Sequence, residues 1–310
     1  MGLITSGKTK ELYSTNKSGV LRMLSLDKLS ADDGAIQSKL SIAAYKNKQN
    51  ALIMKYLQKH GIDTAFIEQI SDTETLVREL QMLGIEFVVR GYPYGTYLLR
   101  NPAFIGSFDE RGLAVLSGTC KDNDGKPMPF AQPQFEMFHK NTFLEADKDV
   151  VAVIDGKDTH KFLRDGVWEK GVHTDPYIDV EKGGDYWGIY NKKKPIIPQY
   201  KVATMAATTS KQELKQVKDM SLESFNILKN GLEKIDVNGK PVKLAGTQFE
   251  FGKDQNGNIK LGDVVDNDTL RLWVGGDPAH ALDKQSVYSG QSDDMVVKKY
   301  AQVTELLERL

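Results

Sequence analysis

The sequence predicts an α+β fold with a cleft between two lobes. Strand-like segments come first in the chain, amphipathic helical segments follow, and a further strand pair precedes the last helix. At 310 residues the chain is long enough for one large domain, or for two to three smaller lobes with ample core. It contains no internal repeat and no low-complexity tract.

The first part of the chain predicts a hairpin, a helix and a buried strand. Residues 10–26 place Leu12 and Tyr13 before a turn at 16–19 and apolar residues on both faces after it, which is typical of an antiparallel hairpin whose second strand is partly covered on both sides. Residues 47–60 carry apolar side chains at helical spacing and end at Gly61, a residue suited to a helix C-cap. Residues 85–99 indicate a buried strand that runs into a Gly/Pro turn.

The second part predicts loops, a long helix, a hairpin and a final helix. Residues 121–133 are loop-like, and residues 181–198 form the longest segment predicted to be irregular. Residues 210–234 place apolar side chains on one helical face. Residues 247–265 read as two strands around an Asn-Gly turn, and a last helix is expected from about 293 to 310.

Composition excludes several classes of protein. Lys and Arg number 41 against 42 Asp and Glu, so the chain has no overall charge that would attract nucleic acid or an anionic membrane. Cys120 is the single cysteine, which excludes an intramolecular disulfide and a cysteine-based zinc site. No apolar run approaches a membrane span and the first residues lack a signal-peptide core. We therefore expect a cytoplasmic protein whose partners are neither nucleic acid polymers nor membranes; a homo-oligomer stays open.

Two acidic residues on the predicted 247–265 hairpin suggest a cation site. If Asn256 and Gly257 are the centre of a type I′ turn, Glu250 faces Asp263 across the strands. Like charges about 5 Å apart are destabilising unless a cation compensates them. Mg²⁺ commonly takes one or two carboxylates together with nucleotide phosphates, so this pair predicts a magnesium–nucleotide site.

The N-terminal segment predicts a phosphate site of an unusual kind. Residues 2–9, GLITSGKT, match the letters of a P-loop, but no strand can precede them and the following KELYST resembles a strand, so we reject that interpretation. A glycine turn between two strands remains, with Lys8 and Lys10 on one face because strand side chains repeat every two residues. Two ammonium groups beside a glycine suit a polyphosphate. The alternative is a solvated basic edge strand.

Seven segments in order resemble SAICAR synthetase (phosphoribosylaminoimidazole-succinocarboxamide synthase). The segments are SGKTKELYST, DKLSADDGA, MLGIEFVVRGYPYGTYLLR, FEMFHKN, HTDPYI, QFEFGKDQNGNIKLGDVVDNDTLRLW and LDK. The resemblance implies an α+β fold related to the ATP-grasp enzymes, with ATP between a small β-rich lobe, 1–84, and a larger lobe, 85–310. It also implies an ATP-dependent carboxylate–amine ligase of purine biosynthesis. In that reaction ATP activates the carboxylate of a carboxylated aminoimidazole ribonucleotide (CAIR) as an acyl phosphate, and the amine of L-aspartate displaces phosphate to give SAICAR.

The resemblance implies where ATP and magnesium bind. Glu250 and Asp263 are expected to hold Mg²⁺, and Glu250 also belongs to the expected ATP site. The other side chains expected at ATP are Lys8, Lys10 and Lys140 at the phosphates, Leu261 under the adenine and Met82 near the hinge strand. Catalytic roles fall to Lys8, Lys10 and Asp268. Metal and lysines together would offset the charge on the transferring phosphoryl group.

The resemblance also implies a substrate site. Arg90, Thr96 and Arg271 are expected to bind the substrate phosphate, because a guanidinium presents a planar fork and a hydroxyl after glycine can approach closely. For Arg90 an interlobe salt bridge is the alternative. The remaining expected substrate residues, whose roles the motifs do not define, are Ser30, Asp33, Arg100, Asp175 and Lys284.

Several positions depart from the family pattern, mostly by losing charge. Gly246 and Gln248 stand where the family has an acidic residue and a lysine, Val264 where it has a glutamate, and Asp266-Asn267 where it has Ser-Pro. Ser286 and Tyr288 replace basic residues, the family's Gly-Lys-Gly is lost around 42–44, and this chain has an insertion at about 143–172. The expected ATP and Mg²⁺ residues are kept. Removing a cation that pairs a buried carboxylate typically costs several kcal/mol, so these changes affect the expected substrate site.

Three alternatives to a SAICAR synthetase therefore stay open. The first is a divergent relative that ligates a different amine or a different carboxylated nucleotide. The second is a nucleotide-binding protein without ligase activity, against which the retained Glu250 and Asp263 argue. The third is a kinase-like phosphotransferase, which would have no reason to keep Arg90, Thr96 and Arg271 together.

Overall fold

The chain forms two compact units in a computed structural model. Unit 1 comprises Met1–Leu83 and Met220–Leu310, and unit 2 comprises Gly84–Asp219. The division into lobes at residue 84 stays a prediction. The structure describes residues 2–31, 36–140, 152–154, 157–158, 175–180, 186–196, 201–207, 209–283 and 292–310.

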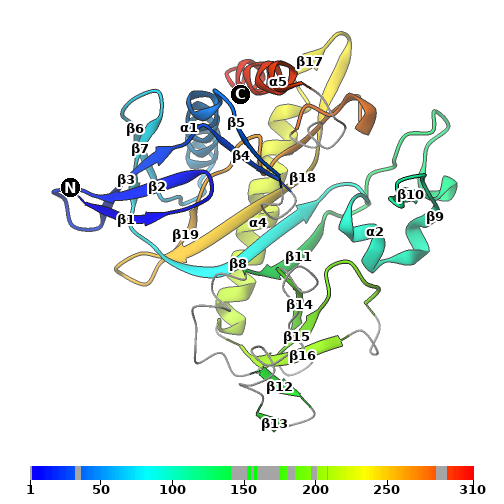
Figure 1. Cartoon of the computed structure of the whole chain (residues 1–310), viewed down its shortest axis with the longest axis horizontal. Helices are drawn as coiled ribbons and strands as arrows, with labels where there is room; N and C mark the ends of the chain where they lie inside the picture. The colour runs from blue at the N-terminus through cyan, green and yellow to red at the C-terminus, as the bar shows by residue number, and fades with distance from the viewer. Residues whose placement is uncertain are drawn as a thin grey trace. The chain divides into compact units, whose positions relative to one another are not determined.

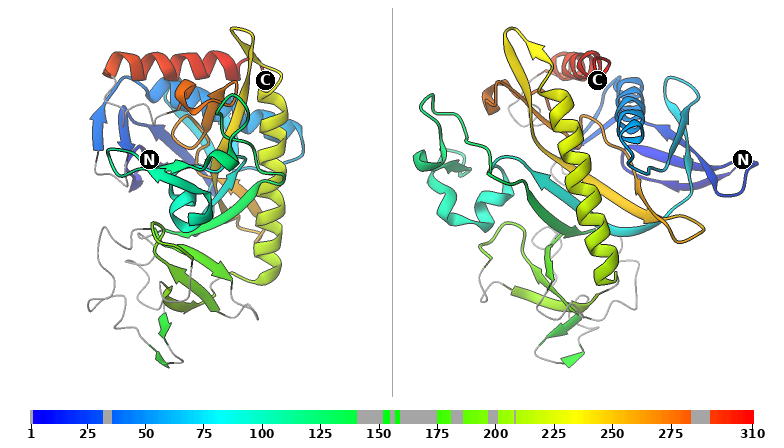
Figure 2. Two further views of the ribbon diagram at one scale, coloured as in Figure 1. Left: turned by 90° about the vertical axis from the view of Figure 1, so that its right-hand side faces the viewer. Right: turned by 180° about the vertical axis from the view of Figure 1, so that it is seen from behind.

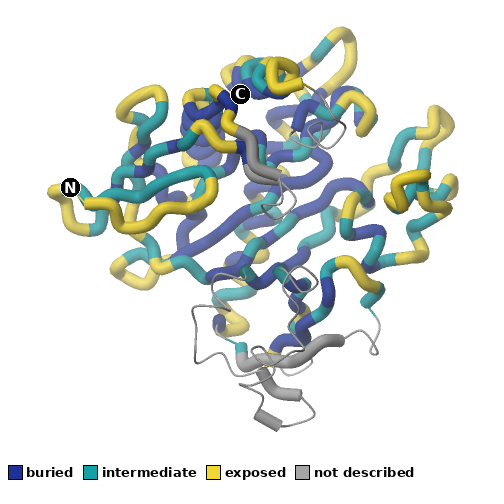
Figure 3. Tube along the Cα trace, viewed as in Figure 1, coloured by how far each residue is buried: buried dark blue, intermediate teal, exposed yellow. Residues whose placement is uncertain are grey.

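Unit 1 begins with a five-stranded antiparallel sheet in the order β1-β2-β3-β7-β6 (Figure 1). The strands are β1 (Leu3–Ser6), β2 (Lys10–Ser14), β3 (Val20–Ser25), β6 (Phe66–Gln69) and β7 (Glu74–Arg78). The predicted 10–26 hairpin is confirmed, with Leu12 opposite Met23. Burial alternates along β3, which is partly covered on both faces as expected, and Figure 3 shows the exposed tips of the β1-β2 hairpin.

Two helices of unit 1 pack together through polar side chains as well as a small apolar cluster. Helix α1 (Ala43–Lys59) and helix α5 (Asp293–Leu307) confirm the predicted helices. Gln49 of α1 donates to the Tyr300 carbonyl and to the Thr304 hydroxyl of α5, at 2.9 and 3.0 Å. Leu29, Leu40, Ile42, Val296 and Tyr300 form the apolar cluster at one end of this contact.

Helix α1 begins four residues earlier than predicted, for a reason that lies outside the helix. The Asp27 carboxylate accepts hydrogen bonds from the Ile42 and Ala43 N–H groups, at 2.9 and 2.8 Å. These first-turn donors have no partner within the helix, and a negative group there also favours the helix dipole. A cap supplied from a distant residue has no local sequence signal.

The centre of unit 1 is the long strand β18 (Lys240–Lys253), most of whose residues are buried (Figure 3). It pairs antiparallel with β17 (Asp236–Val237), β19 (Ile259–Gly262) and β20 (Arg271–Val274). Residues Asn238 and Gly239, between β17 and β18, have φ values of 54° and 78°, which a type I′ turn requires. A separate two-stranded pair, β4 (Lys28–Ala31) with β5 (Ile36–Lys39), precedes α1.

Unit 2 holds an antiparallel run of strands in the order β13-β12-β16-β15-β14-β11-β8. The strands are β8 (Gln81–Arg90), β11 (Gln134–His139), β12 (Ala152–Ile154), β13 (Lys157–Asp158), β14 (Tyr177–Val180), β15 (Tyr186–Tyr190) and β16 (Lys201–Ala206). Between β8 and β11 come α2 (Thr96–Arg100), η2 (Pro102–Phe104), the pair β9 (Ile105–Phe108) and β10 (Ala114–Leu116), and η3 (Gly118–Cys120).

The predicted helix at 210–234 is confirmed as α4 (Lys211–Leu232), the long helix of Figure 2. The Ser210 hydroxyl accepts from the Glu213 N–H and the Glu213 carboxylate accepts from the Ser210 N–H, a reciprocal cap at its first turn. Val217, Phe225, Leu228 and Leu232 form its buried face.

Some predicted loops and bounds differ from the structure. The segment 181–198 is not irregular throughout, because it contains β15, whose Trp187 and Ile189 are fully buried. Within 85–99 the predicted buried strand is confirmed as part of β8, and it runs into a stretch at 91–95 that is neither helix nor strand; α2, which follows from Thr96, was not predicted. The predicted loop at 121–133 contains neither helix nor strand, as expected. Most of the predicted insertion at 143–172 lies outside the described residues.

Another short helix, η5 (Pro278–His280), follows β20. Among the described residues, no helix combines the length and the apolar character that a membrane crossing requires.

Candidate functional site

Lys10 and Asp263 form an ion pair in unit 1. Lys10 is the first residue of β2, and Asp263 follows the end of β19. The Gly7 N–H donates to the Lys10 carbonyl (2.8 Å), so a turn joins the strands β1 and β2, and the rejection of the P-loop is confirmed. Lys8 lies exposed in this turn. The backbone of Asp263 has a φ of 52°, a left-handed conformation that non-glycine residues adopt mainly where surrounding contacts enforce it.

The register predicted for the 247–265 hairpin is wrong by one residue. Glu250 lies opposite Gly262, and Asp263 is the next residue along the chain. The cause is a three-residue loop, in which the Gly257 N–H donates to the Asp254 carbonyl (2.9 Å) and Gly257 has a φ of 81°. The Asp254 carboxylate stabilises it by accepting from the Asn256 and Asn258 N–H groups, both at 2.9 Å.

Leu261 of β19 has a fully buried side chain, and the half-buried Met82 of β8 packs against the same hairpin. The Leu261 N–H donates to the Asp63 carbonyl at 2.9 Å, and the Leu261 carbonyl accepts from the Ala65 N–H at 2.7 Å. Met82 packs so closely on Gly252 and Gly262 that a Cβ at either glycine would come within 3.0 or 3.2 Å of it. The two glycines therefore bring the hairpin backbone against Met82.

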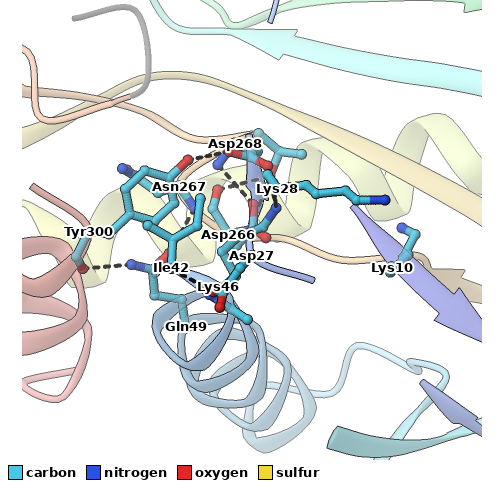
Figure 4. A network of polar contacts seen from close by, with 12 residues as sticks. Lys10, Asp27, Lys28, Ile42, Lys46, Gln49, Asp266, Asn267, Asp268 and Tyr300 are labelled. Atoms are coloured by element: carbon cyan, nitrogen blue, oxygen red, sulfur yellow. Dashed lines mark hydrogen bonds and ion pairs between the residues drawn. The ribbon is translucent and has the colours of Figure 1, made fainter. Parts of the chain in front are cut away.

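Asp268 is held in a buried polar network (Figure 4). Lys46 of α1, whose side chain is 3% exposed, lies 2.7 Å from the Asp268 carboxylate. The Tyr300 hydroxyl of α5 donates to the other oxygen of that carboxylate. The Asp268 N–H donates to the Asp266 carboxylate at 2.8 Å. Asp268 is thus fixed from two helices and from its own loop.

Burial and charge perturb the titration of this network. Burial, and then the neighbouring Asp268 charge, raise the pKa of Asp266 to about 6, against the opposing effect of Lys46. Burial lowers the pKa of Lys46, but Asp268 and Asp266 outweigh it and the net shift is upward. Burial and the same two carboxylates raise the pKa of the Tyr300 hydroxyl well above its ordinary value.

Two further polar residues of α1 fix the backbone that leads into Asp268. The Asn50 side-chain oxygen accepts from the Val265 N–H at 3.0 Å, and the Gln49 side-chain oxygen accepts from the Asn267 N–H at 2.9 Å. Both side chains are almost completely buried. Sequence reasoning missed them together with Lys46, because polar residues on a helix normally indicate its solvent face.

Arg271 begins β20, opposite Gly246 of β18. Its Nη1 donates to the carbonyls of Asp268 and Leu270, at 3.0 and 2.8 Å. One nitrogen of the guanidinium is therefore anchored to the loop that carries Asp268, and the side chain is half-buried.

In unit 2, Arg90 and Arg100 share the carboxylate of Glu136. Arg90 Nε lies 2.5 Å from one oxygen of Glu136, and Arg100 contacts the other. Burial raises the pKa of Glu136, but the two guanidinium groups outweigh burial and lower it. Two positive charges against one negative charge leave this cluster with a net charge of +1. Glu136 lies within the FEMFHKN segment but was not predicted as a site residue.

The other predicted residues are distributed over both units. Lys140 follows β11, where its N–H donates to the Gly84 carbonyl (3.0 Å), and Thr96 is half-buried at the start of α2. Asp175, with a φ of 43°, lies 4.0 Å from the Lys192 ammonium. Ser30 belongs to β4, but its side chain is outside the described residues, as are Asp33 and Lys284 entirely.

The structure therefore brings together some of the predicted residues within each unit. In unit 1 it pairs Lys10 with Asp263 and links Asp268 to Arg271; in unit 2 it links Arg90 to Arg100 through Glu136.

A family model and the similar proteins of known name all point to the same family. The family model of SAICAR synthetase matches residues 3–153 and 190–305. The chain is 27% identical over 274 residues to the phosphoribosylaminoimidazole-succinocarboxamide synthase of Staphylococcus carnosus (strain TM300), covering 88% of this chain and 85% of the relative. The corresponding protein of Staphylococcus aureus (strain JH9) is 26% identical over the same length and shares.

Solved structures share the fold. The crystal structure of phosphoribosylaminoimidazole-succinocarboxamide synthase from Ehrlichia chaffeensis superposes with a TM-score of 0.67 at 21% identity, covering 100% of this chain and 99% of that one. A type-2 SAICAR synthetase in complex with ADP gives a TM-score of 0.65 at 22% identity, covering 99% and 97%. These likenesses confirm the predicted α+β, SAICAR synthetase-like fold. Because the family model also matches well over half of its residues, the chain belongs to the SAICAR synthetase family.

Proposed function

We propose that this chain is an ATP-dependent carboxylate–amine ligase that joins CAIR to L-aspartate and forms SAICAR in purine biosynthesis. The observation that carries the proposal is the family match over residues 3–153 and 190–305, which includes nearly every predicted site residue. In this reaction the carboxylate of CAIR takes the γ-phosphoryl group of ATP, with release of ADP. The aspartate amine then forms the amide bond as the C–O bond to phosphate breaks.

Glu250 and Asp263 suit a magnesium ion that arrives with the nucleotide. The described residues contain no group of three or more acidic, histidine or cysteine side chains that could hold a metal by themselves. Two carboxylates completed by phosphate oxygens are a usual Mg²⁺ environment, and Lys10 beside Asp263 adds a cation for those phosphates. Bound Mg²⁺ would offset the negative charge of the transferring phosphoryl group.

We infer complementary roles for the remaining ATP residues. Lys8 and Lys10 supply ammonium groups at the phosphates, because both lie at the turn that precedes β2. Lys140 is proposed for the same phosphates on family resemblance alone. The close fit of Met82 on the hairpin glycines supports a flat apolar surface, with Leu261 beneath it, for the adenine.

For the ribonucleotide we infer that Arg90, Thr96 and Arg271 bind the phosphate. Arg90 supports this best, because the cluster around it carries a net charge of +1. Asp268 is fixed by two helices and one loop, as a group that must meet a reacting amine in a defined orientation would be. Ser30, Asp33, Asp175 and Lys284 remain proposed substrate residues by resemblance. We also infer a cytoplasmic location.

Asp266 favours one alternative, a ligase with a different amine. It stands where the family has serine, it is 1% exposed, and it adds a second carboxylate beside Asp268. A second acid next to the reacting region would disfavour an amine that carries two carboxylates. Aspartate remains our first choice of amine, because the positive charge of Lys46 can compensate the negative charge that Asp266 adds.

The test is ADP release with Mg-ATP, CAIR and each of the amino acids in turn, with product mass by mass spectrometry. We expect turnover with aspartate and a product with the mass of SAICAR. Turnover with another amine, but none with aspartate, would replace this proposal with the alternative. If ATP binds but none of the tested amines is ligated, both the proposal and the alternative are contradicted.

A further inference from the structure

The guanidinium of Arg100 is enclosed within unit 2. Its side chain is 0% exposed and lies against the rings of Phe138 and Tyr177, with distances of 4.9 and 5.1 Å to the ring centres. Nη1 donates to the Lys192 carbonyl at 2.7 Å, and Nη2 contacts Glu136. A guanidinium with these contacts has its charge and its orientation fixed by protein groups, and no exposed surface with which to bind a substrate.

Glu136 connects Arg100 to Arg90. It lies on β11, and its neighbour two residues along, Gln134, is opposite Arg90 on β8. Because side chains two residues apart share a face of a strand, Glu136 and Arg90 meet diagonally across the two strands. Each oxygen of Glu136 takes one arginine, so neither arginine can claim the whole carboxylate.

Arg90 keeps part of its guanidinium available. Nε is bound to Glu136, Nη1 donates to the Tyr94 carbonyl at 3.4 Å, and the Tyr94 ring lies 4.7 Å away. The Arg90 side chain is 8% exposed, whereas that of Arg100 is 0% exposed. A planar group fixed at Nε and Nη1 presents its remaining N–H groups in one direction, as recognition of a phosphate oxygen requires.

We propose that Glu136 and Arg100 are positioning residues that orient Arg90 for the phosphate of the ribonucleotide, and that neither touches the substrate. This inference rests on the proposed function, in which Arg90 binds that phosphate. Arg100 holds one oxygen of Glu136, which limits how far Glu136 neutralises Arg90. The pair therefore supplies both the direction of the fork and the surplus positive charge.

Glu136→Gln separates orientation from simple attraction, because the two effects have opposite signs. Removing the carboxylate makes the cluster more positive, so attraction alone predicts tighter binding of a phosphate. Positioning predicts weaker binding, because the amide cannot accept from both arginines. Arg100→Met is the second variant: it leaves the Glu136–Arg90 pair balanced, and it keeps the test possible if Glu136→Gln does not fold.

The assay is calorimetric binding of an aminoimidazole ribonucleotide, and of the matching nucleoside without phosphate, to the full chain without ATP. We expect each variant to raise Kd for the nucleotide by about ten- to a hundredfold, with Kd for the nucleoside and KM for ATP unchanged. The double variant should lose no more affinity for the nucleotide than the single variant with the larger loss, because both residues act through Arg90. Arg111→Met, at an exposed pair with Asp109 in the same unit, is the control and should bind as wild type.

Two results would overturn the inference: unchanged or tighter nucleotide binding in the single variants, or additive losses in the double variant, which would mean that Arg100 acts on the substrate directly. A wild-type chain that binds nucleotide no better than nucleoside would overturn the substrate assignment as well. A wild-type chain that prefers the nucleotide, together with unaffected variants, would overturn the positioning role alone.

Discussion

Replacing Lys46 by methionine tests the buried network around Asp268. The substitution keeps the length and the apolar stem of the side chain but removes the ammonium that lies 2.7 Å from Asp268. It leaves the buried Asp266 and the partly buried Asp268 without the Lys46 ammonium. Tyr300 still donates to the Asp268 carboxylate, and the bonds of Gln49 and Asn50 to the backbone of this loop do not involve Lys46.

The expected loss follows from the burial of this pair. Breaking a buried ion pair by removing one partner costs about 3 to 5 kcal/mol. Asp266, with a pKa of about 6, can take up a proton at pH 7 for about 1.4 kcal/mol, which limits the penalty. We therefore expect the free energy of unfolding to fall by about 3 kcal/mol at pH 7. At pH 5 Asp266 is largely protonated, so one buried negative charge fewer is left uncompensated and the loss should shrink to about half.

Urea unfolding of wild type and variant at pH 7 and pH 5, followed by circular dichroism, measures both quantities. Lys48→Met is the matched control, two residues further along α1. Lys48 pairs with Glu308 with side chains 47% and 43% exposed, so its loss should stay below about 1 kcal/mol at either pH. If Lys46→Met costs no more than Lys48→Met, or costs the same at both pH values, the network does not have the electrostatic role assigned to it.

Three further predictions follow from single contacts. Asp263→Asn should abolish ligation and leave the unfolding transition unchanged, because the residue is half-buried at a predicted metal site. Asp266→Asn should flatten the pH dependence of stability: the raised pKa gives a contribution that is complete below about pH 3.8, is lost as pH rises through about 6, and amounts to about 3 kcal/mol. Asp27→Ala should lower the free energy of unfolding by about 1 kcal/mol, because α1 loses its capping carboxylate.

Each of these has a direct check. Steady-state ADP release and urea unfolding together test Asp263→Asn, and turnover at the wild-type rate would remove the metal assignment. Urea series from pH 4 to pH 8 test Asp266→Asn, and a slope equal to that of wild type would show that Asp266 titrates normally. Asp27→Asn is the control for Asp27→Ala, since its side-chain oxygen still accepts hydrogen bonds, and equal losses in both would refute a capping role.

Local patterns in the sequence predicted several of the helices and strands. Helix α4 could be predicted because its buried face repeats at helical spacing, and the β2-β3 hairpin because apolar residues lie on both sides of a turn. The segment of β15 was missed because glycines and prolines surround it, although Tyr186–Tyr190 alternates large apolar residues and its Trp187 is fully buried. The surrounding glycines and prolines indicated a loop more strongly than five residues indicated a strand.

The hairpin error has a similar local cause. The chain contains two Asn-Gly pairs, and the type I′ turn occurs at Asn238–Gly239, between β17 and β18. At Asn256–Gly257 the carboxylate of Asp254 favours the longer loop by accepting two backbone N–H groups. Asp236 precedes Asn238 at the same spacing and its carboxylate accepts from the Gly239 N–H, so the Asp-x-Asn-Gly pattern alone does not distinguish the two turns.

The site could be predicted in part only. Lys10 and Asp263 were both expected at the nucleotide, and their ion pair joins segments far apart in the chain. Lys46, Gln49 and Glu136 were missed, because their roles depend on partners that are distant in sequence; Lys46 and Asp268 are 222 residues apart. Polar residues buried in this way are recognised from tertiary contacts.

Oxygen transfer tests the central claim, that ATP activates a carboxylate for attack by an amine. Incubating the chain with Mg-ATP, aspartate and CAIR whose carboxylate carries ¹⁸O allows the released phosphate to be analysed by mass spectrometry. An acyl phosphate predicts that each phosphate released carries one ¹⁸O from the carboxylate, in step with amide formation. Phosphate that contains solvent oxygen and no ¹⁸O from the carboxylate would contradict the account.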